Sequence, residues 1–193
     1  MKRTARITVL LALVFFLMAA MTTTVLAKKP PPDPTGGGGA DITVQANEAG
    51  WVTSGTWQLE NYTADGGSYI LVANDAGASA TYTFIKDLKV KSQKIDVYAS
   101  KYWLSGDVQV RIDGVLVATV SLDTVGGVKM APFSAPLFGQ LIYSGTFSNT
   151  NSNHTVTLTA VGSGGPGIVN IGGIDYNLSG LHFVNVQYIH TYP

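Results

Sequence analysis

The chain contains no cysteine, which excludes disulfide bonds, thiol nucleophiles and cysteine-based metal sites. Histidine is scarce, with three residues, and only 12% of all residues are charged. Twelve basic residues are matched by twelve acidic ones, so the chain has no excess of positive charge. This balance argues against a general nucleic-acid-binding protein, because such proteins carry a basic stripe and a high isoelectric point.

The only long apolar run lies at the N-terminus. Lys2, Arg3 and Arg6 precede the run from residue 7 to residue 21, and Val25-Leu26-Ala27 then offers small residues at the spacing that signal peptidase recognises. An uncleaved membrane anchor is the alternative, but the run falls short of the roughly 20 residues that a spanning helix needs. We therefore expect residues 1–27 to be a signal peptide and the protein to be secreted or associated with the cell surface.

Residues 28–40 are rich in proline and glycine and begin Lys-Lys-Pro-Pro-Pro-Asp-Pro. Such a segment cannot bury a core, so we expect a linker, extended at its prolines and flexible at its glycines. Removing three of the twelve basic residues with the signal peptide leaves nine against twelve acidic ones, so the mature protein is slightly acidic. Residues 41–193 are expected to form one domain, and a domain of about 150 residues can bury a core without disulfides.

The sequence from residue 41 onward predicts strands rather than helices. Short runs rich in Thr, Val, Ile and Tyr alternate in polarity with a period of two, and Gly, Asn, Asp and Ser separate them. Asp113-Gly114 between two alternating runs predicts a tight β-hairpin. Residues 168–176 and 182–188 are expected to be the final strands, and residues 178–193 form a strand-like tail. The pattern predicts an all-β protein, a two-sheet antiparallel β-sandwich of the jelly-roll type.

Several short motifs occur in an order that resembles the galactose-binding-domain-like jelly rolls, a superfamily that includes carbohydrate-binding modules. They are Gly55-Thr56-Trp57, Gly66-Gly67-Ser68-Tyr69, the segments 77–84 and 106–114, Asn153-His154-Thr155, and the segment 171–176. The resemblance covers residues 51 to 176 and implies the sandwich fold and a binding function. It does not imply a particular ligand, because this fold supports many functions.

An enzyme is not expected. Gly162-Ser163-Gly164-Gly165 has neither the helix nor the neighbouring base that a nucleophile elbow needs. His182 and His190 would lie roughly 26 Å apart along one strand, so they would not share a metal. The acidic residues are better explained as turn residues than as the paired carboxylates of a glycosidase.

No cofactor is expected to be required, but a structural calcium ion is the one alternative that remains open. Carboxylates near strand ends can hold calcium together with backbone carbonyls. The candidate ligands are Glu48, Asp65 and Asp175. The competing interpretation is that these acids are solvated turn residues.

The candidate binding residues are aromatic. Tyr102 and Trp103 lie between serine and glycine residues, which predicts a loop tip where a flat ring could stack on a sugar. Lys101 and Asp107 flank this pair and could bind hydroxyl groups. The alternative is that Tyr102 and Trp103 pack over the end of a sheet. A basic stripe would instead suit an anionic ligand, although the mixed faces of its positions favour lysines that serve solubility; these are Lys86, Lys89, Lys91, Lys94 and Lys101.

The leading hypothesis is therefore a non-catalytic binding module with a polysaccharide or glycan as partner. The alternative is a structural subunit of an extracellular layer or fibre. In that case the partner is another copy or a surface protein, and the N-terminal segment or the tail from residue 178 pairs with a neighbour's sheet edge.

Overall fold

The computed structural model describes residues 41–62, 68–84, 92–148 and 153–192. The predicted signal peptide, the whole of the predicted linker and Asp65 lie outside these residues. The described part of the chain forms sixteen strands, and no helix in it has the length and apolarity to span a membrane. The prediction of an all-β antiparallel sandwich is confirmed.

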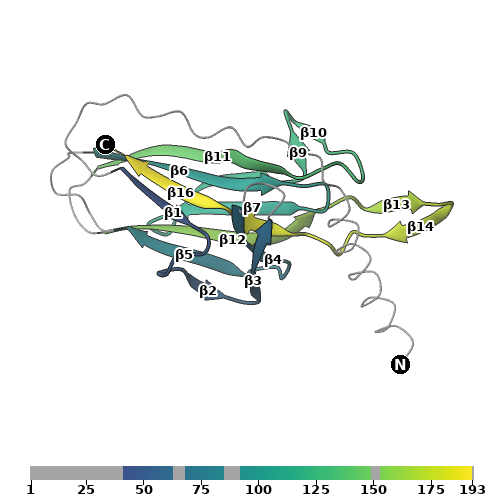
Figure 1. The fold of residues 1–193 in the computed structure, drawn as a ribbon, viewed down its shortest axis with the longest axis horizontal. Coiled ribbons are helices and arrows are strands. Elements are labelled where there is room, and N and C mark those ends of the chain that lie inside the picture. Colours follow the sequence, from purple (N-terminus) through teal and green to yellow (C-terminus); the bar gives the residue numbers. More distant parts are fainter. Residues whose placement is uncertain (1–40, 63–67, 85–91, 149–152, 193) are drawn as a thin grey trace.

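Two large sheets form the sandwich (Figure 1). The four-stranded sheet has the order β1, β16, β6, β11, with bounds Ile42–Gln45, Tyr188–Tyr192, Ser92–Lys101 and Leu137–Ser148. The five-stranded sheet has the order β2, β5, β12, β7, β8, with bounds Val52–Ser54, Ser79–Phe84, His154–Gly164, Gly106–Ile112 and Val115–Ser121. All their strand pairs are antiparallel.

Smaller sheets complete the fold. A three-stranded sheet contains β15 (Val184–Val186), β4 (Ser68–Ala73) and β3 (Trp57–Tyr62). Two hairpins project at one end of the sandwich (Figure 1). They are β9 (Thr124–Val125) with β10 (Val128–Lys129), and β13 (Ile168–Ile171) with β14 (Ile174–Asn177). The predicted single strand at 168–176 is thus a hairpin, because Gly172 and Gly173 both adopt positive φ and reverse the chain.

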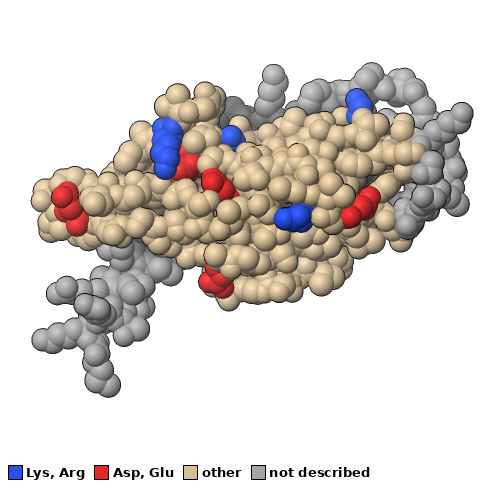
Figure 2. Space-filling model, turned by 180° about the vertical axis from the view of Figure 1, so that it is seen from behind, with Lys and Arg blue, Asp and Glu red and all other residues tan. Residues whose placement is uncertain are grey.

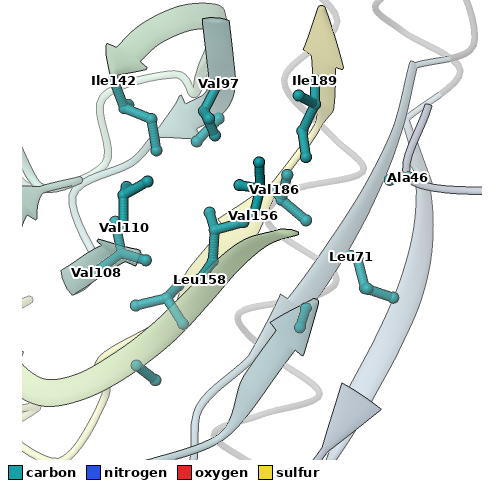
Figure 3. Packing of buried hydrophobic residues seen from close by; sticks show 14 of the residues in the cluster. Ala46, Leu71, Val97, Val108, Val110, Ile142, Val156, Leu158, Val186 and Ile189 are labelled. Carbon is teal, nitrogen blue, oxygen red and sulfur yellow. The ribbon is translucent and has the colours of Figure 1, made fainter. Parts of the chain in front are cut away.

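The core lies between the two large sheets and follows the period-two pattern of the sequence. Val108, Val110 and Ile112 of β7 point inward, and so do Val156 and Leu158 of β12. Val97 and Ile189 face them from the four-stranded sheet (Figure 3). Trp51 and Trp57 pack against this cluster, and both remain half-buried.

The hairpin between β7 and β8 is the predicted one. Asp113 and Gly114 adopt φ of 50° and 80°. The Asp113 carboxylate also joins the hairpin to β12, since it accepts a hydrogen bond from the Thr155 amide at 2.7 Å and lies 2.8 Å from His154 Nδ1. Burial alone would raise the pKa of Asp113, but the hydrogen bonds from His154 and Thr155 lower it below its usual value.

The C-terminal tail is an integral part of the sandwich. β16 lies between β1 and β6 and pairs with both. Asn185 of β15 is buried and exchanges hydrogen bonds with the backbone of Ser100 at the end of β6, at 2.7 and 2.9 Å. The tail strand β16 is therefore paired on both sides within its own sheet, whereas β1 and β15 are edge strands that are paired on one side.

Candidate functional site

Trp103 is not the exposed ring that its serine and glycine neighbours predict. It is 4% exposed, in a small second cluster with Leu104, Val169 and Leu178. The ring of Phe133 packs against it with centroids 5.0 Å apart, and Tyr102 meets it edge to face at 5.8 Å. The prediction of a loop-tip platform is wrong for Trp103, because a second loop supplies Phe133 and covers the indole. The alternative, packing over a sheet end, describes its environment.

Lys101 and Asp107 are both engaged by neighbouring loops and strands. Lys101 Nζ donates to the Thr124 carbonyl at 2.7 Å. Asp107 accepts hydrogen bonds from the hydroxyls of Ser121 and Ser163, the latter at 2.8 Å. These contacts join β7 to β8 and β12, so the two charged side chains stabilise this end of the sandwich.

Of the three acids predicted as calcium ligands, the two that the structure describes each make a local hydrogen bond. Glu48 accepts a hydrogen bond from the Gln45 amide at 3.2 Å, in the turn after β1. Asp175 accepts one from Asn170 at 2.7 Å, within the projecting hairpin β13–β14. Asp65 lies outside the described residues. Within the described ranges, no three His, Asp or Glu side chains gather as a metal site. The contacts of Glu48 and Asp175 are those of turn and hairpin residues.

The basic stripe also lacks support among the described lysines. Lys94 lies over the ring of Tyr192, and Lys101 is held by Thr124. The back of the molecule is largely uncharged, and its few basic and acidic groups are interspersed, lying side by side at one end (Figure 2). Lys86, Lys89 and Lys91 lie outside the described residues.

A different group of side chains gathers on the outer face of the four-stranded sheet. Ile95 and Val97 of β6 and Ile189 of β16 point into the core, so the alternate residues of both strands point outward. We call these outward residues the aromatic face; they are Lys94, Asp96, Tyr98, Tyr188, His190 and Tyr192. The strand register places Tyr98 beside Tyr188, Asp96 beside His190, and Lys94 beside Tyr192.

The rings of the aromatic face form two stacked pairs. Tyr98 and Tyr188 stack with centroids 4.3 Å apart and planes inclined by 16°. His190 and Tyr192 stack at 4.9 Å and 29°, and the Lys94 ammonium lies 5.4 Å from the Tyr192 ring. All four rings are half-buried, so each retains some contact with solvent.

Asp96 lies between the two pairs and is only 7% exposed. Its Oδ2 accepts a hydrogen bond from the Tyr192 hydroxyl at 3.1 Å. Its Oδ1 is buried and has no hydrogen-bond partner in the structure. A buried carboxylate oxygen without a donor is unusual, so Asp96 retains the capacity to accept one more hydrogen bond.

The electrostatics of the aromatic face are dominated by this carboxylate and by burial. Burial raises the pKa of Tyr188 to about 12, with the nearby Tyr98 and Asp96 adding to the effect. Burial and then the charge of Asp96 also raise the pKa of Tyr98. Both hydroxyls therefore stay neutral at ordinary pH and can donate or accept hydrogen bonds.

The margins of the face extend it over the neighbouring strands. The register places Gln45 of β1 beside Tyr188 and the half-exposed Leu141 of β11 beside Tyr98. At the β1 margin, His190 Nε2 contacts the Asp41 carboxylate. The result is an apolar and amide-lined border around stacked rings and one buried acceptor.

The sequence pattern of two segments indicates this face, but neither segment predicts it when it is considered alone. Tyr188, His190 and Tyr192 alternate with core residues, and so do Lys94, Asp96 and Tyr98. An aromatic residue at each solvent-facing position of β16 is a departure from the usual polar alternation. The pairing of β16 with β6, distant in sequence, is what joins the two rows.

Comparison with known proteins gives structural matches only. No family model matches the chain, and no curated protein matches it. Among solved structures, it is similar to the C-terminal CBM6 of a marine laminarinase from Zobellia galactanivorans (14% identity, TM-score 0.47, 80% of this chain and 100% of that chain). It is also similar to a family 35 carbohydrate-binding module from Clostridium thermocellum (15% identity, TM-score 0.46, 80% and 98%).

A third similar structure is the carbohydrate-binding module CBM36 in complex with calcium and xylotriose (16% identity, TM-score 0.37, 78% of this chain and 99% of that chain). All three similar structures are carbohydrate-binding modules.

Proposed function

We propose that this protein is a secreted, non-catalytic carbohydrate-binding module and that its aromatic face is the glycan-binding surface. The observation that carries the proposal is the combination of stacked, half-buried rings with Asp96, whose Oδ1 has no hydrogen-bond partner. Sugar binding needs aromatic surface for the apolar face of the ring and polar groups for its hydroxyls. Both are present within two adjacent strands.

This surface is a better candidate than the loop around Trp103. A buried ring that packs on Phe133 is not available for stacking on a ligand. For β16 a structural role by strand exchange is less suitable than glycan binding, because this strand already pairs on both sides within its sheet. We rest the proposal on this geometry rather than on the solved structures, whose TM-scores are below 0.5.

The test is a glycan-array screen of the mature protein beside a variant with Tyr98→Ala, Tyr188→Ala and Tyr192→Ala. We expect the wild type to bind a glycan and the triple variant to lose that binding while still melting cooperatively. Thr119→Ala, at an exposed position of β8 in the other sheet, is the matched control and should bind as the wild type does. Full binding by a folded triple variant would contradict the proposal.

Secretion is tested separately. Cleavage of the signal peptide after Ala27 predicts a mature chain that begins at Lys28. N-terminal sequencing of the exported protein should therefore return Lys-Lys-Pro. A chain that keeps residues 1–27 and stays with the membrane would contradict this part of the proposal.

A further inference from the structure

The two stacked pairs of the aromatic face lie in line along the strands. Tyr188 and Tyr192 are four residues apart on the same side of β16, so their Cα atoms are separated by about 13 Å. We call Tyr98 with Tyr188 the first station, and His190 with Tyr192 the second. One sugar ring cannot reach from Tyr188 at the first station to Tyr192 at the far end of the second, whereas an extended chain of about three sugars can, given the rise per residue of a strand.

Asp96 occupies the space between the stations. It is the cross-strand neighbour of His190, donates nothing when ionised, and receives a hydrogen bond from Tyr192 on one oxygen only. A sugar that bridges the two stations passes over this position, where its hydroxyl can donate to the remaining carboxylate oxygen once a rotation of the Asp96 side chain exposes that buried atom.

The acidic side chains around the stations disfavour binding of anionic sugars. Asp96 lies between the stations, and Asp41 contacts His190 at the margin. The one described lysine of the face, Lys94, lies over the Tyr192 ring, at the far end of the second station. A uronate or sulfate placed between the stations would meet a nearly buried negative charge, which is unfavourable.

We propose that the aromatic face binds an uncharged, extended oligosaccharide along β6 and β16, with sugar rings on both stations and a hydroxyl on Asp96. This inference rests on the proposed glycan-binding function and adds the length, direction and charge of the ligand. The preferred ligand is a neutral linear chain, and affinity grows with chain length until both stations are occupied.

The test is calorimetric titration of the mature protein with oligosaccharide ladders of two to six units. The probes are cello-, xylo-, laminari- and manno-oligosaccharides, with oligogalacturonides as the anionic ladder. We expect one neutral ladder to gain at least about tenfold in affinity from the disaccharide to the hexasaccharide, which is about 1.4 kcal/mol. The oligogalacturonides should bind more weakly at every length.

Single-station variants make the test specific. Tyr192→Ala should lower hexasaccharide affinity to about the disaccharide level and remove the length dependence. Asp96→Asn should lower the affinity for the hexasaccharide and reduce the ratio of the affinity for neutral chains to that for anionic chains. Thr119→Ala should change neither, and thermal melts check that each variant is folded.

The outcomes separate the two proposals. Equal affinity for short and long chains, a preference for oligogalacturonides, or an unchanged length dependence in Tyr192→Ala would overturn the two-station inference and leave glycan binding in place. Absence of binding to every ladder and to the glycan array would overturn the proposed function and the inference together.

Discussion

At the scale of single residues, Asp96 organises the aromatic face. Its carboxylate is nearly buried and lies among Tyr98, His190 and Tyr192, with one oxygen bonded and the other without a donor. An incompletely satisfied buried acid is costly for stability, and such costs occur at functional sites more than elsewhere. The arrangement is therefore consistent with a position selected for contact with a ligand.

The ionisation of Tyr188 gives a prediction at this scale. Its pKa is raised from 10.0 to about 12, so the folded state holds the phenol proton more tightly than the unfolded state does. This contribution to stability is complete below pH 10 and is lost as the pH rises from 10 to about 12. Urea unfolding across that range should show a falling free energy of unfolding, and Tyr188→Phe should reduce the fall.

A control separates the causes of this shift. Burial is its largest cause, with Tyr98 and Asp96 contributing less. Asp96→Asn should therefore lower the pKa of Tyr188 only part of the way to 10.0, as followed by phenolate absorbance. A return to the ordinary value in Asp96→Asn would show that charge rather than burial is the main cause.

At the scale of elements, the hairpin at Asp113 shows how local sequence sets a strand pair. Asp113→Ala removes the acceptor for the Thr155 amide and places alanine at a φ of 50°. Since this carboxylate is 44% exposed, we expect a loss of about 1–2 kcal/mol in the free energy of unfolding. Asp113→Asn tolerates the backbone conformation and keeps an acceptor, so its loss should be smaller.

The same carboxylate predicts a dependence on acid. The pKa of Asp113 is lowered below 3.8, so its contribution is present above that value and is lost as the pH falls through the lowered pKa. The stability difference between the wild type and Asp113→Asn should therefore shrink in that acid range. A difference that grows on acidification would contradict the assigned hydrogen bonds.

The loop that carries Trp103 gives the second prediction for an element. Its indole fills the small cluster beneath the projecting hairpin, so Trp103→Ala should cost about 3–5 kcal/mol. Trp103→Phe keeps a ring against Phe133 and should cost less. Denaturant unfolding measures the stability loss of both variants. Trp103→Phe should retain glycan binding. Loss of glycan binding by this variant while it remains folded would instead place the binding site at the loop around Trp103.

The elements also show what local pattern can and cannot predict. β7 and β12 were predictable because each alternates in polarity, and β8 was predictable because Asp113-Gly114 joins it to β7. The position of β16 was not, because its pairing with β1 and β6 depends on which distant strands share the core. Trp103 was misjudged for the same reason, since Phe133 comes from another loop.

At the scale of the whole molecule, the sandwich acts as a rigid support for a surface. Its core fixes alternate residues of β6 and β16, and this leaves the other residues of the same strands in a defined array (Figure 3). Binding residues on central strands are held more precisely than residues on loops. The sequence alone predicted the β-sandwich. The proposed binding surface could be recognised only from the pairing of β6 with β16 in the three-dimensional structure.

The most direct test of this account is an NMR titration of the isotopically labelled mature protein with a glycan that it binds. If the aromatic face is the binding surface, the largest amide shifts will lie on β6 and β16, around Asp96, Tyr98, Tyr188 and Tyr192. Shifts centred on residues 102–105 and 122–136, with β6 and β16 unchanged along residues 94–98 and 188–192, would contradict it and place the glycan at the loop end.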